Sequence, residues 1–171
     1  MKLVHIVGRK NHGKTTLLVE LLRELRGRGL RVGTIKHSPH KHELDAPGKD
    51  SFVHRHAGAA PAAIVAADLS AVFVPRTPGD DPIASLLPLY SECDAILVEG
   101  YVMGPGHKIE VWRRERGTPP LAAEHEGILA VVTDDAISLP VPTWPRSDVG
   151  AVADGLLQIL GNRRDADPGG K

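Results

Sequence analysis

The chain has few aromatic residues, one cysteine and no excess charge, and each scarcity excludes something. Phe, Trp and Tyr together make up 4% of the 171 residues, so the core must be filled by aliphatic side chains. Because Cys93 is the one cysteine, an internal disulfide is excluded, which fits a reducing compartment. Lys and Arg number 21, as do Asp and Glu, and this balance argues against a general nucleic-acid binder.

Long hydrophobic runs are also missing. No stretch approaches the ~20 apolar residues of a membrane-spanning helix, and the apolar run at the N-terminus is too short for a signal peptide. We therefore expect a soluble, cytoplasmic protein that binds neither membrane nor nucleic acid. The hydrophobic content of 42% is enough to build a packed core.

Strand-like and helix-like patterns alternate along the chain. Short apolar segments are typical of buried parallel strands, and segments such as residues 14–26 carry Leu at helical spacing. This alternation predicts an α/β protein with one domain over residues 1–160 and a mostly parallel central sheet flanked by helices. We expect an antiparallel edge or hairpin at about 61–75 and 108–115, and a disordered tail over 161–171.

Individual elements follow from the same patterns. Strands are expected at 2–7, 30–36, 95–100, 128–133 and 141–144. Helices are expected at 14–26, at 50–57 with Asp50 or Ser51 as its cap, at 80–93 with Pro82 in its first turn, and at 148–160 after a cap at Ser147 or Asp148.

The strongest motif is GRKNHGKTT, Gly8–Thr16, which matches G-x-x-x-x-G-K-[ST] between a predicted strand and a predicted helix. Its glycines permit a loop whose N–H groups turn inward around phosphate oxygens. Lys14 should contact the β- and γ-phosphates, the Thr15 hydroxyl should ligate Mg²⁺, and Thr16 should lie near the α-phosphate. The motif predicts a P-loop NTPase domain. The nucleotide-binding residues expected here are Gly8, Arg9, Lys10, Asn11, His12, Gly13, Lys14, Thr15 and Thr16.

A carboxylate, Glu99, ends the apolar segment AILVEG. Ligands of open parallel sheets bind at the carboxyl ends of the strands, so Glu99 should face Thr15 and hold Mg²⁺ directly or through water. The alternative is a solvated residue at a strand end.

The loop KHSPHKHELDAPGKDS, Lys36–Ser51, is longer than the roughly 2–6 residues that a connector usually needs, and it is highly charged. It should leave the sheet on the same side as the motif loop. The residues expected at phosphate are Lys36, His37 and Lys49. Asp45 and Asp50 are candidates to orient an attacking water or to complete the Mg²⁺ shell.

The motif loop, this charged loop with the AGA that follows it, and LVEGY followed by KIEV carry a resemblance. Over about residues 2–160 the chain resembles the molybdopterin-guanine dinucleotide biosynthesis protein B family, MobB. The resemblance implies a GTP-binding homodimer with weak GTPase activity that assists a separate guanylyltransferase in molybdenum-cofactor maturation. It implies GTP and Mg²⁺ as cofactors, and it leaves open whether molybdopterin or its guanine dinucleotide binds this chain directly.

The residues that read the base are less clearly marked. The N-K-x-D signature of many GTPases is absent, but VVTDD at 131–135 ends a predicted strand. Asp134 or Asp135 can accept hydrogen bonds from guanine N1–H and N2–H₂, and the alternative is an Asp-rich turn.

Basic residues elsewhere allow two interpretations each. Lys108 should share a strand face with Glu110 and approach the nucleotide or a second ligand, or else form a surface ion pair. The stretch 113–116 can meet an acidic partner or a second phosphate, or belong to a solvated edge strand. Arg9 can reach a partner's nucleotide across a dimer, or be exposed.

Two other functions compete with the adapter interpretation. A small-molecule kinase would use the same motif loop with an Arg-bearing lid, for which 113–116 is a short substitute. A nickel-delivery GTPase is suggested by His37, His40 and His42, but these residues have neither a Cys partner nor a paired motif at defined spacing. For this histidine group, zinc binding, contact with phosphate or pterin, and a solvated loop remain the alternatives.

Overall fold

The computed structural model describes residues 2–77 and 79–161. The chain divides into two compact units: unit 1 comprises residues 1–38 and 88–171, and unit 2 comprises residues 39–87. The predicted single domain over 1–160 stays a prediction, and the predicted tail lies outside the described residues except for Gly161. In chain order the elements are β1 (Leu3–Val7), α1 (Lys14–Gly27), β2 (Val32–Lys36), α2 (Asp50–His56), β3 (Ala62–Val65), β4 (Ser70–Phe73), η1 (Ala84–Tyr90), β5 (Ala95–Glu99), β6 (His107–Val111), η2 (Arg114–Arg116), η3 (Leu121–Ala123), β7 (Ile128–Val132), β8 (Thr143–Trp144) and α3 (Val149–Gly161).

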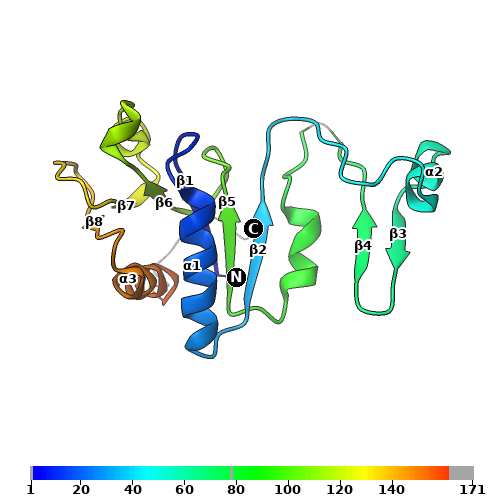
Figure 1. The fold of residues 1–171 in the computed structure, drawn as a ribbon, viewed down its shortest axis with the longest axis horizontal. Helices are drawn as coiled ribbons and strands as arrows, with labels where there is room; N and C mark the ends of the chain where they lie inside the picture. The colour runs from blue at the N-terminus through cyan, green and yellow to red at the C-terminus, as the bar shows by residue number, and fades with distance from the viewer. Residues whose placement is uncertain (1, 78, 162–171) are drawn as a thin grey trace, which may run out of the picture. The chain divides into compact units, whose positions relative to one another are not determined.

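In the described part of unit 1, six strands form one sheet in the order β2-β5-β1-β6-β7-β8 (Figure 1). All neighbouring strands in this sheet run parallel. The chain leaves β1 toward the β2 edge and later returns to the other side of β1 as β6, so the strand order reverses around β1. Open α/β sheets bind ligands at the carboxyl ends of their strands at such a reversal. The predicted α/β fold with a mostly parallel sheet is confirmed.

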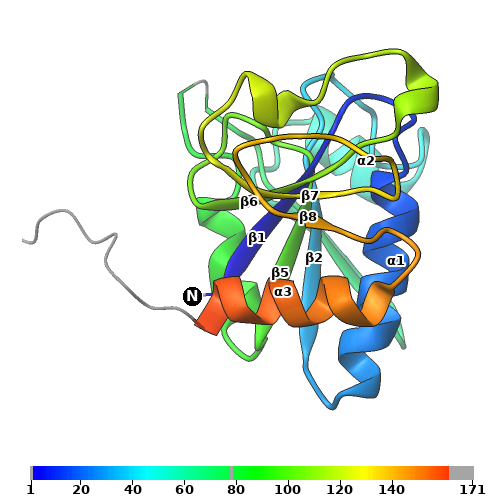
Figure 2. The same cartoon turned by 90° about the vertical axis from the view of Figure 1, so that its left-hand side faces the viewer.

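Helices α1 and α3 cover one face of this sheet (Figure 2). Strand side chains alternate between the two faces, and on this face Val4 and Ile6 of β1 pack with Leu17, Leu21 and Leu156 of the helices. The apolar residues of α1 recur every three to four positions, which places them on one stripe of the helix. This aliphatic core fixes the direction in which α1 leaves the sheet, and so the position of the loop before it.

The opposite face of the sheet has a smaller apolar cluster that includes Val7, Trp112 and Val131. It also buries polar side chains, since His5 and Glu110 are both 0% exposed. The segment between β6 and β7 covers this face, because its helix η3 belongs to the same cluster.

Strand β6 corrects one sequence prediction. It pairs in parallel with β1 on one side and β7 on the other, so the antiparallel edge or hairpin predicted at 108–115 is wrong. The alternation of Lys108 and Glu110 with apolar residues indicated a half-exposed strand, but both side chains are buried. The polar face is buried because the segment after β6 folds back over it and supplies hydrogen-bond donors.

In unit 2, β3 and β4 form an antiparallel pair in which Ala62 lies opposite Phe73 and Val65 lies opposite Ser70. The hairpin predicted at 61–75 is confirmed. The guanidinium of Arg55 in α2 lies 4.7 Å from the ring centre of Phe73, a cation–π contact between helix and hairpin.

Three of the predicted helices can be compared with the structure. Helix α2 begins at Asp50 as expected, but its N-cap is Lys49 without a side-chain cap bond. The helix expected at 80–93 is a 3-10 helix, Ala84–Tyr90, that contains Pro88, so Pro82 precedes it. Helix α3 is capped as predicted by Asp148, whose carboxylate accepts a 2.9 Å hydrogen bond from the N–H of Ala151. None of the described helices is long and apolar enough to cross a membrane.

Candidate functional site

The loop between β1 and α1 turns through left-handed backbone angles. The φ angles are 140° at Gly8, 66° at Asn11 and 95° at Gly13. A Cβ on Gly8 would lie 2.5 Å from the carbonyl oxygen of Val111, so glycine is required there. Gly13 precedes α1, and within the described chain no side chain caps this helix. The first N–H groups of α1 are therefore available to an anion.

Lys14 is the first residue of α1, and its ammonium folds back over the loop. It donates a 2.8 Å hydrogen bond to the carbonyl oxygen of Arg9. Burial and the nearby positive charge of Lys36 lower the pKa of Lys14, while Glu99 acts in the opposite direction. An ammonium that is partly desolvated beside an uncapped helix N-terminus is stabilised by an anion such as phosphate.

Thr15 and Glu99 meet next to Lys14. The Thr15 hydroxyl donates a 2.8 Å hydrogen bond to Glu99 Oε1, and the Lys36 ammonium donates to the same oxygen. Lys36 ends β2 and Glu99 ends β5, and the parallel register places the two residues side by side. Glu99 therefore faces Thr15, as their positions at one edge of the sheet led us to expect. Its role in metal binding stays a prediction.

The Thr15 and Glu99 oxygens fit the donor set of Mg²⁺. This ion prefers oxygen ligands, and a hydroxyl and a carboxylate are both suitable. The two oxygens already lie side by side, joined by a 2.8 Å hydrogen bond, so one ion could contact both. Thr15 and Glu99 are the side chains that would hold a bound Mg²⁺, which would supply positive charge to stabilise phosphate oxygens.

A cavity of about 540 Å³ opens beside these residues. It is lined by Lys10, Asn11, Gly13, Lys14, Thr15, Thr16, Lys36, Glu99, Arg113 and Arg116. The lining is mainly cationic and carries one carboxylate, so the cavity is suited to a polyanion.

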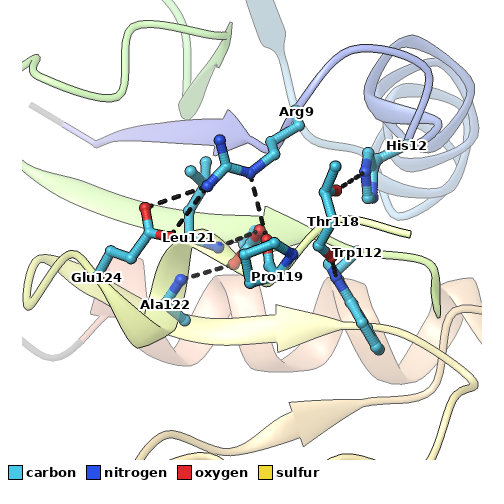
Figure 3. A network of polar contacts seen from close by, with 9 residues as sticks. Arg9, His12, Trp112, Thr118, Pro119, Leu121, Ala122 and Glu124 are labelled. Carbon is cyan, nitrogen blue, oxygen red and sulfur yellow. Dashed lines mark hydrogen bonds and ion pairs between the residues drawn. The ribbon is translucent and has the colours of Figure 1, made fainter. Parts of the chain in front are cut away.

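The segment that follows β6 holds the first half of the motif loop (Figure 3). Arg9 lies 3.1 Å from each carboxylate oxygen of Glu124, and its Nε donates to the carbonyl oxygen of Pro119 at 3.3 Å. Arg9 therefore has partners within its own chain, although the pair is partly exposed and so contributes little stability.

His12 links the same two segments (Figure 3). Its Nδ1 accepts a 3.0 Å hydrogen bond from the N–H of Arg113, so Nε2 carries the proton and donates to the hydroxyl of Thr118 at 3.0 Å. The Trp112 indole N–H donates to the Thr118 carbonyl oxygen at 2.8 Å. Burial, and then the charge of Lys14, lower the pKa of His12. The His12 side chain therefore links the two segments, and the predicted contact of His12 with the nucleotide stays a prediction.

Glu110 anchors the far end of this segment. Its two carboxylate oxygens accept 2.8 Å hydrogen bonds from the N–H groups of Leu121 and Ala122, at the start of η3. Burial raises the pKa of Glu110, and the two N–H donors act against that rise.

Lys108 lies in β6, next to β1 in the sheet. In the parallel register it lies beside His5, three positions before Gly8, and its ammonium donates a 3.1 Å hydrogen bond to the carbonyl oxygen of Gly106. Lys108 is not among the residues that line the cavity described above, and its predicted approach to the nucleotide or a second ligand stays a prediction. The surface ion pair is wrong, because the side chain is buried.

Two other predicted site residues in unit 1 are engaged in local contacts. The N–H of His37 donates to the carbonyl oxygen of Glu99 at 3.0 Å, and its ring stacks on Tyr101 with centres 4.3 Å apart. Asp134 accepts hydrogen bonds from the N–H and the hydroxyl of Ser147, both at 2.9 Å. These bonds lower the pKa of the Asp134 carboxyl group.

The remaining predicted residues lie in unit 2. Asp45 accepts a 3.0 Å hydrogen bond from the Ser51 hydroxyl and lies 3.5 Å from Arg55, so it braces the start of α2. The predicted roles of Asp45, Lys49 and Asp50 at phosphate, water or Mg²⁺ stay predictions. Within residues 2–77 and 79–161, no group of three or more His, Cys, Asp or Glu side chains is arranged to hold a metal ion.

Three residues that shape this site have no recognisable signal in the sequence. Thr118 and Glu124 contact the motif loop, and Glu110 holds the start of η3, each through a hydrogen bond across more than ten residues of chain. Glu110 resembles any polar residue of an alternating strand, and nothing local marks a carboxylate that will accept backbone N–H groups from a later helix.

The fold and the site together define the class. The chain is an open, mostly parallel α/β protein with the Walker A sequence between β1 and α1 and a facing carboxylate at the end of β5. Within that class, the family model described as "MobB: Molybdopterin guanine dinucleotide synthesis protein B" matches residues 3–134. The chain belongs to the MobB family.

Similar proteins support this membership. The chain is 37% identical over 155 residues to an Escherichia coli protein named molybdopterin-guanine dinucleotide biosynthesis adapter protein, covering 86% of this chain and 87% of the relative. It is 38% identical over 154 residues to the Haemophilus influenzae protein of that name, covering 89% and 85%. The crystal structure of Bacillus subtilis MobB shares the fold, with a TM-score of 0.71, 23% identity, and coverage of 95% of this chain and 100% of that one.

Proposed function

We propose that this chain is a GTP-binding adapter protein of molybdopterin-guanine dinucleotide biosynthesis. The names of its relatives support the adapter role in that pathway. In this account the chain binds GTP with Mg²⁺, hydrolyses it weakly, and assists a separate guanylyltransferase in the cytoplasm.

The observation that carries the proposal is the contact of Thr15 with Glu99 beside Lys14. Lys14 and the N–H groups of the motif loop would hold phosphates, and Thr15 and Glu99 would hold the Mg²⁺ that bridges them. Thr15 and Lys36 both donate hydrogen bonds to Glu99, the carboxylate that lines the cavity. Glu99 would therefore act through the metal and not as a free base, which fits weak hydrolysis.

Guanine preference rests on the family and on the acidic turn after β7. Asp134 accepts two bonds from Ser147, and Asp135 accepts a 2.8 Å bond from the N–H of Arg114. Each carboxylate has further lone pairs, so each can also accept from guanine N1–H and N2–H₂.

A homodimer is the proposed assembly. The hairpin β3–β4 is a separate two-stranded sheet whose residues Ile64, Val65 and Val72 are 47%, 78% and 55% exposed. A two-stranded sheet is marginally stable alone, and exposed apolar side chains on its strands are suited to burial against a second copy.

The direct test is reconstitution of the guanylation step. We expect the guanylyltransferase to form molybdopterin-guanine dinucleotide faster when this chain and GTP are present, and we expect Lys14→Ala to abolish the gain while keeping its circular dichroism spectrum. An equal rate with the parent chain, with Lys14→Ala and with no added chain would refute the adapter function.

Competition against a labelled guanine nucleotide separates the adapter from the kinase alternative, which the two arginines in the cavity lining favour. GTP should displace the label at a concentration about tenfold or more below that of ATP, as expected where polar groups read the base. Equal displacement by both nucleotides, with phosphoryl transfer from ATP to a small molecule, would support a kinase instead.

A further inference from the structure

Two arginines from the segment after β6 line the phosphate cavity together with the motif loop. Arg113 and Arg116 are part of the lining. The Arg113 guanidinium lies against the backbone of the motif loop, since a Cβ placed on Gly13 would be 3.0 Å from its Nη2. These side chains are therefore next to the helix N-terminus that would hold phosphate.

The backbone that carries Arg113 is fixed to the motif loop. Its N–H donates to His12 Nδ1 at 3.0 Å, and the other ring nitrogen of His12 binds Thr118. Within the same segment, the Trp112 indole N–H donates a hydrogen bond to the Thr118 carbonyl oxygen. The backbone of Arg113 is thus positioned by partly buried contacts between its segment and the motif loop.

Glu115 stands between the two guanidinium groups. Its Oε1 lies 3.7 Å from Arg113 Nη1 and 3.3 Å from Arg116 Nη2. Glu115 is 63% exposed, and the arginines are 37% and 44% exposed. Such exposed pairs are weak and exchange readily with another anion.

We propose that Arg113 and Arg116 form an arginine clamp, supplied by the same chain, that binds phosphate oxygens of the nucleotide together with Lys14. When no nucleotide is bound, the Glu115 carboxylate lies beside the two guanidinium groups, and the phosphates displace it when the nucleotide binds. The inference rests on the proposed nucleotide site and assigns two further phosphate-binding residues to it.

Arginine chemistry favours phosphate as the ligand. A guanidinium presents parallel N–H donors that match two oxygens of a phosphate or a carboxylate, and a dianionic phosphate competes better for them than a solvated carboxylate does. The lining has five cationic side chains, Lys10, Lys14, Lys36, Arg113 and Arg116, against one carboxylate, Glu99. A nucleotide polyphosphate with Mg²⁺ would reduce this excess of positive charge.

The test is the dissociation constant of a non-hydrolysable GTP analogue with Mg²⁺, measured by calorimetry at fixed ionic strength. Arg113→Ala and Arg116→Ala keep the backbone N–H groups, including the one bound to His12. Arg26→Ala is the charge-matched control, because Arg26 is exposed and lies 12 residues beyond Lys14, about 18 Å along the helix axis. Lys14→Ala reports on the nucleotide site itself.

We expect each clamp variant to weaken binding about tenfold, the usual effect of losing a charge-assisted hydrogen bond, while Arg26→Ala stays within about twofold. Glu115→Gln should strengthen binding, because the competing carboxylate is removed. That gain should disappear when Glu115→Gln is combined with Arg113→Ala and Arg116→Ala, as in a double-mutant cycle.

Clamp variants that bind like Arg26→Ala would overturn the clamp, as would a Glu115→Gln variant that binds more weakly than the parent. If Lys14→Ala loses affinity in the same titrations, the nucleotide site stands and the clamp alone is wrong. If the parent binds no nucleotide, or if Lys14→Ala binds as the parent does, the proposed function fails and the clamp fails with it.

Discussion

The Thr15 hydroxyl donates a 2.8 Å hydrogen bond to the carboxylate of Glu99, 84 residues further along the chain. The contact joins the first turn of α1 to the end of β5, at the carboxyl edge of the sheet where the strand order reverses. Both side chains offer oxygen atoms to a cation, and the Lys36 ammonium also donates a hydrogen bond to the Glu99 carboxylate. This relationship is the structural basis for the first prediction.

Replacing Glu99 with Gln should act through Mg²⁺. The amide keeps the size of the side chain and can still accept from Thr15, but it removes the negative charge that a hard cation prefers. We expect GTP hydrolysis and the magnesium dependence of GTP binding to fall about tenfold, and GDP affinity measured without metal to stay within about twofold. Calorimetry with and without Mg²⁺ measures this. An equal loss in both conditions would indicate misfolding or direct nucleotide contact instead.

The charged loop 36–51 should respond to the γ-phosphate. Asp50 is the first residue of α2. In the predicted role its carboxylate positions water and does not hold phosphate, so we expect Asp50→Asn to lower GTP turnover while GDP affinity stays within about twofold. Asp45→Asn is a less specific test of turnover, because it also changes the contacts of Asp45 with Ser51 and Arg55.

Hydrogen exchange measures the response of the loop directly. The amides of residues 36–51 should exchange more slowly with a GTP analogue than with GDP, as in segments ordered by a γ-phosphate. The same exchange in both states, together with normal turnover of Asp50→Asn, would leave this stretch as a connector.

Stability should fall in mildly acidic solution because of two buried histidines. Burial is the main cause that lowers the pKa of both His5 and His12 below the ordinary value of 6.5. The unfolded chain therefore takes up protons first as the pH falls, so the stabilisation is complete above about pH 6.5 and is lost as the pH drops through the folded-state values.

Variants show which histidine ring causes the change in the free energy of unfolding with pH. Each histidine contributes at most about 1.4 kcal/mol per pH unit to the free energy of unfolding. His12→Asn keeps an acceptor for the Arg113 N–H but does not titrate, so its urea-unfolding series from pH 7.5 to 5 should have a smaller slope than the parent. In the combined His5→Asn and His12→Asn variant, the free energy of unfolding should depend still less on pH. A slope unchanged by both substitutions would exclude the buried histidines as its source.

Two glycines of unit 1 should respond to alanine with opposite signs. A Cβ on Gly33 would lie 2.2 Å from a ring carbon of Tyr90, whose hydroxyl is held by the Thr34 carbonyl oxygen. Gly33→Ala should therefore cost about 1–3 kcal/mol by overpacking. Gly27, the last residue of α1, has nothing within 4 Å of such a Cβ, so Gly27→Ala should stabilise by up to about 1 kcal/mol. Urea unfolding compares the two. No loss in Gly33→Ala would contradict the packing around Gly33, and a loss in Gly27→Ala would contradict the open space at the end of α1.

Much of the fold could be predicted from local patterns. The Leu residues of α1, the apolar run of β5 and the cap at Asp148 each follow from spacing or chemistry within one element. The position of Glu99 opposite Thr15 also follows, because parallel strands place their carboxyl ends at one edge of a sheet.

What could not be predicted depends on contacts between distant segments. The place of β6 in the sheet was missed because Lys108 and Glu110 look like a solvated strand face, and only the fold shows that η3 supplies donors to Glu110. The tie from His12 to Arg113 likewise has no local signature, since it joins residues 101 positions apart. A sequence pattern reports periodicity within an element, and these contacts arise from the order of strands.

The central claim is that the loop Gly8–Thr16 binds the phosphates of a guanine nucleotide, and titration of a non-hydrolysable GTP analogue into the parent chain and into Lys14→Ala, with Mg²⁺ present, tests it most directly. The parent should bind with one site per chain, and Lys14→Ala should bind about tenfold or more weakly, because a charge-assisted contact to phosphate is lost. The Arg26→Ala variant should match the parent. Equal affinity in the parent and in Lys14→Ala would contradict the claim.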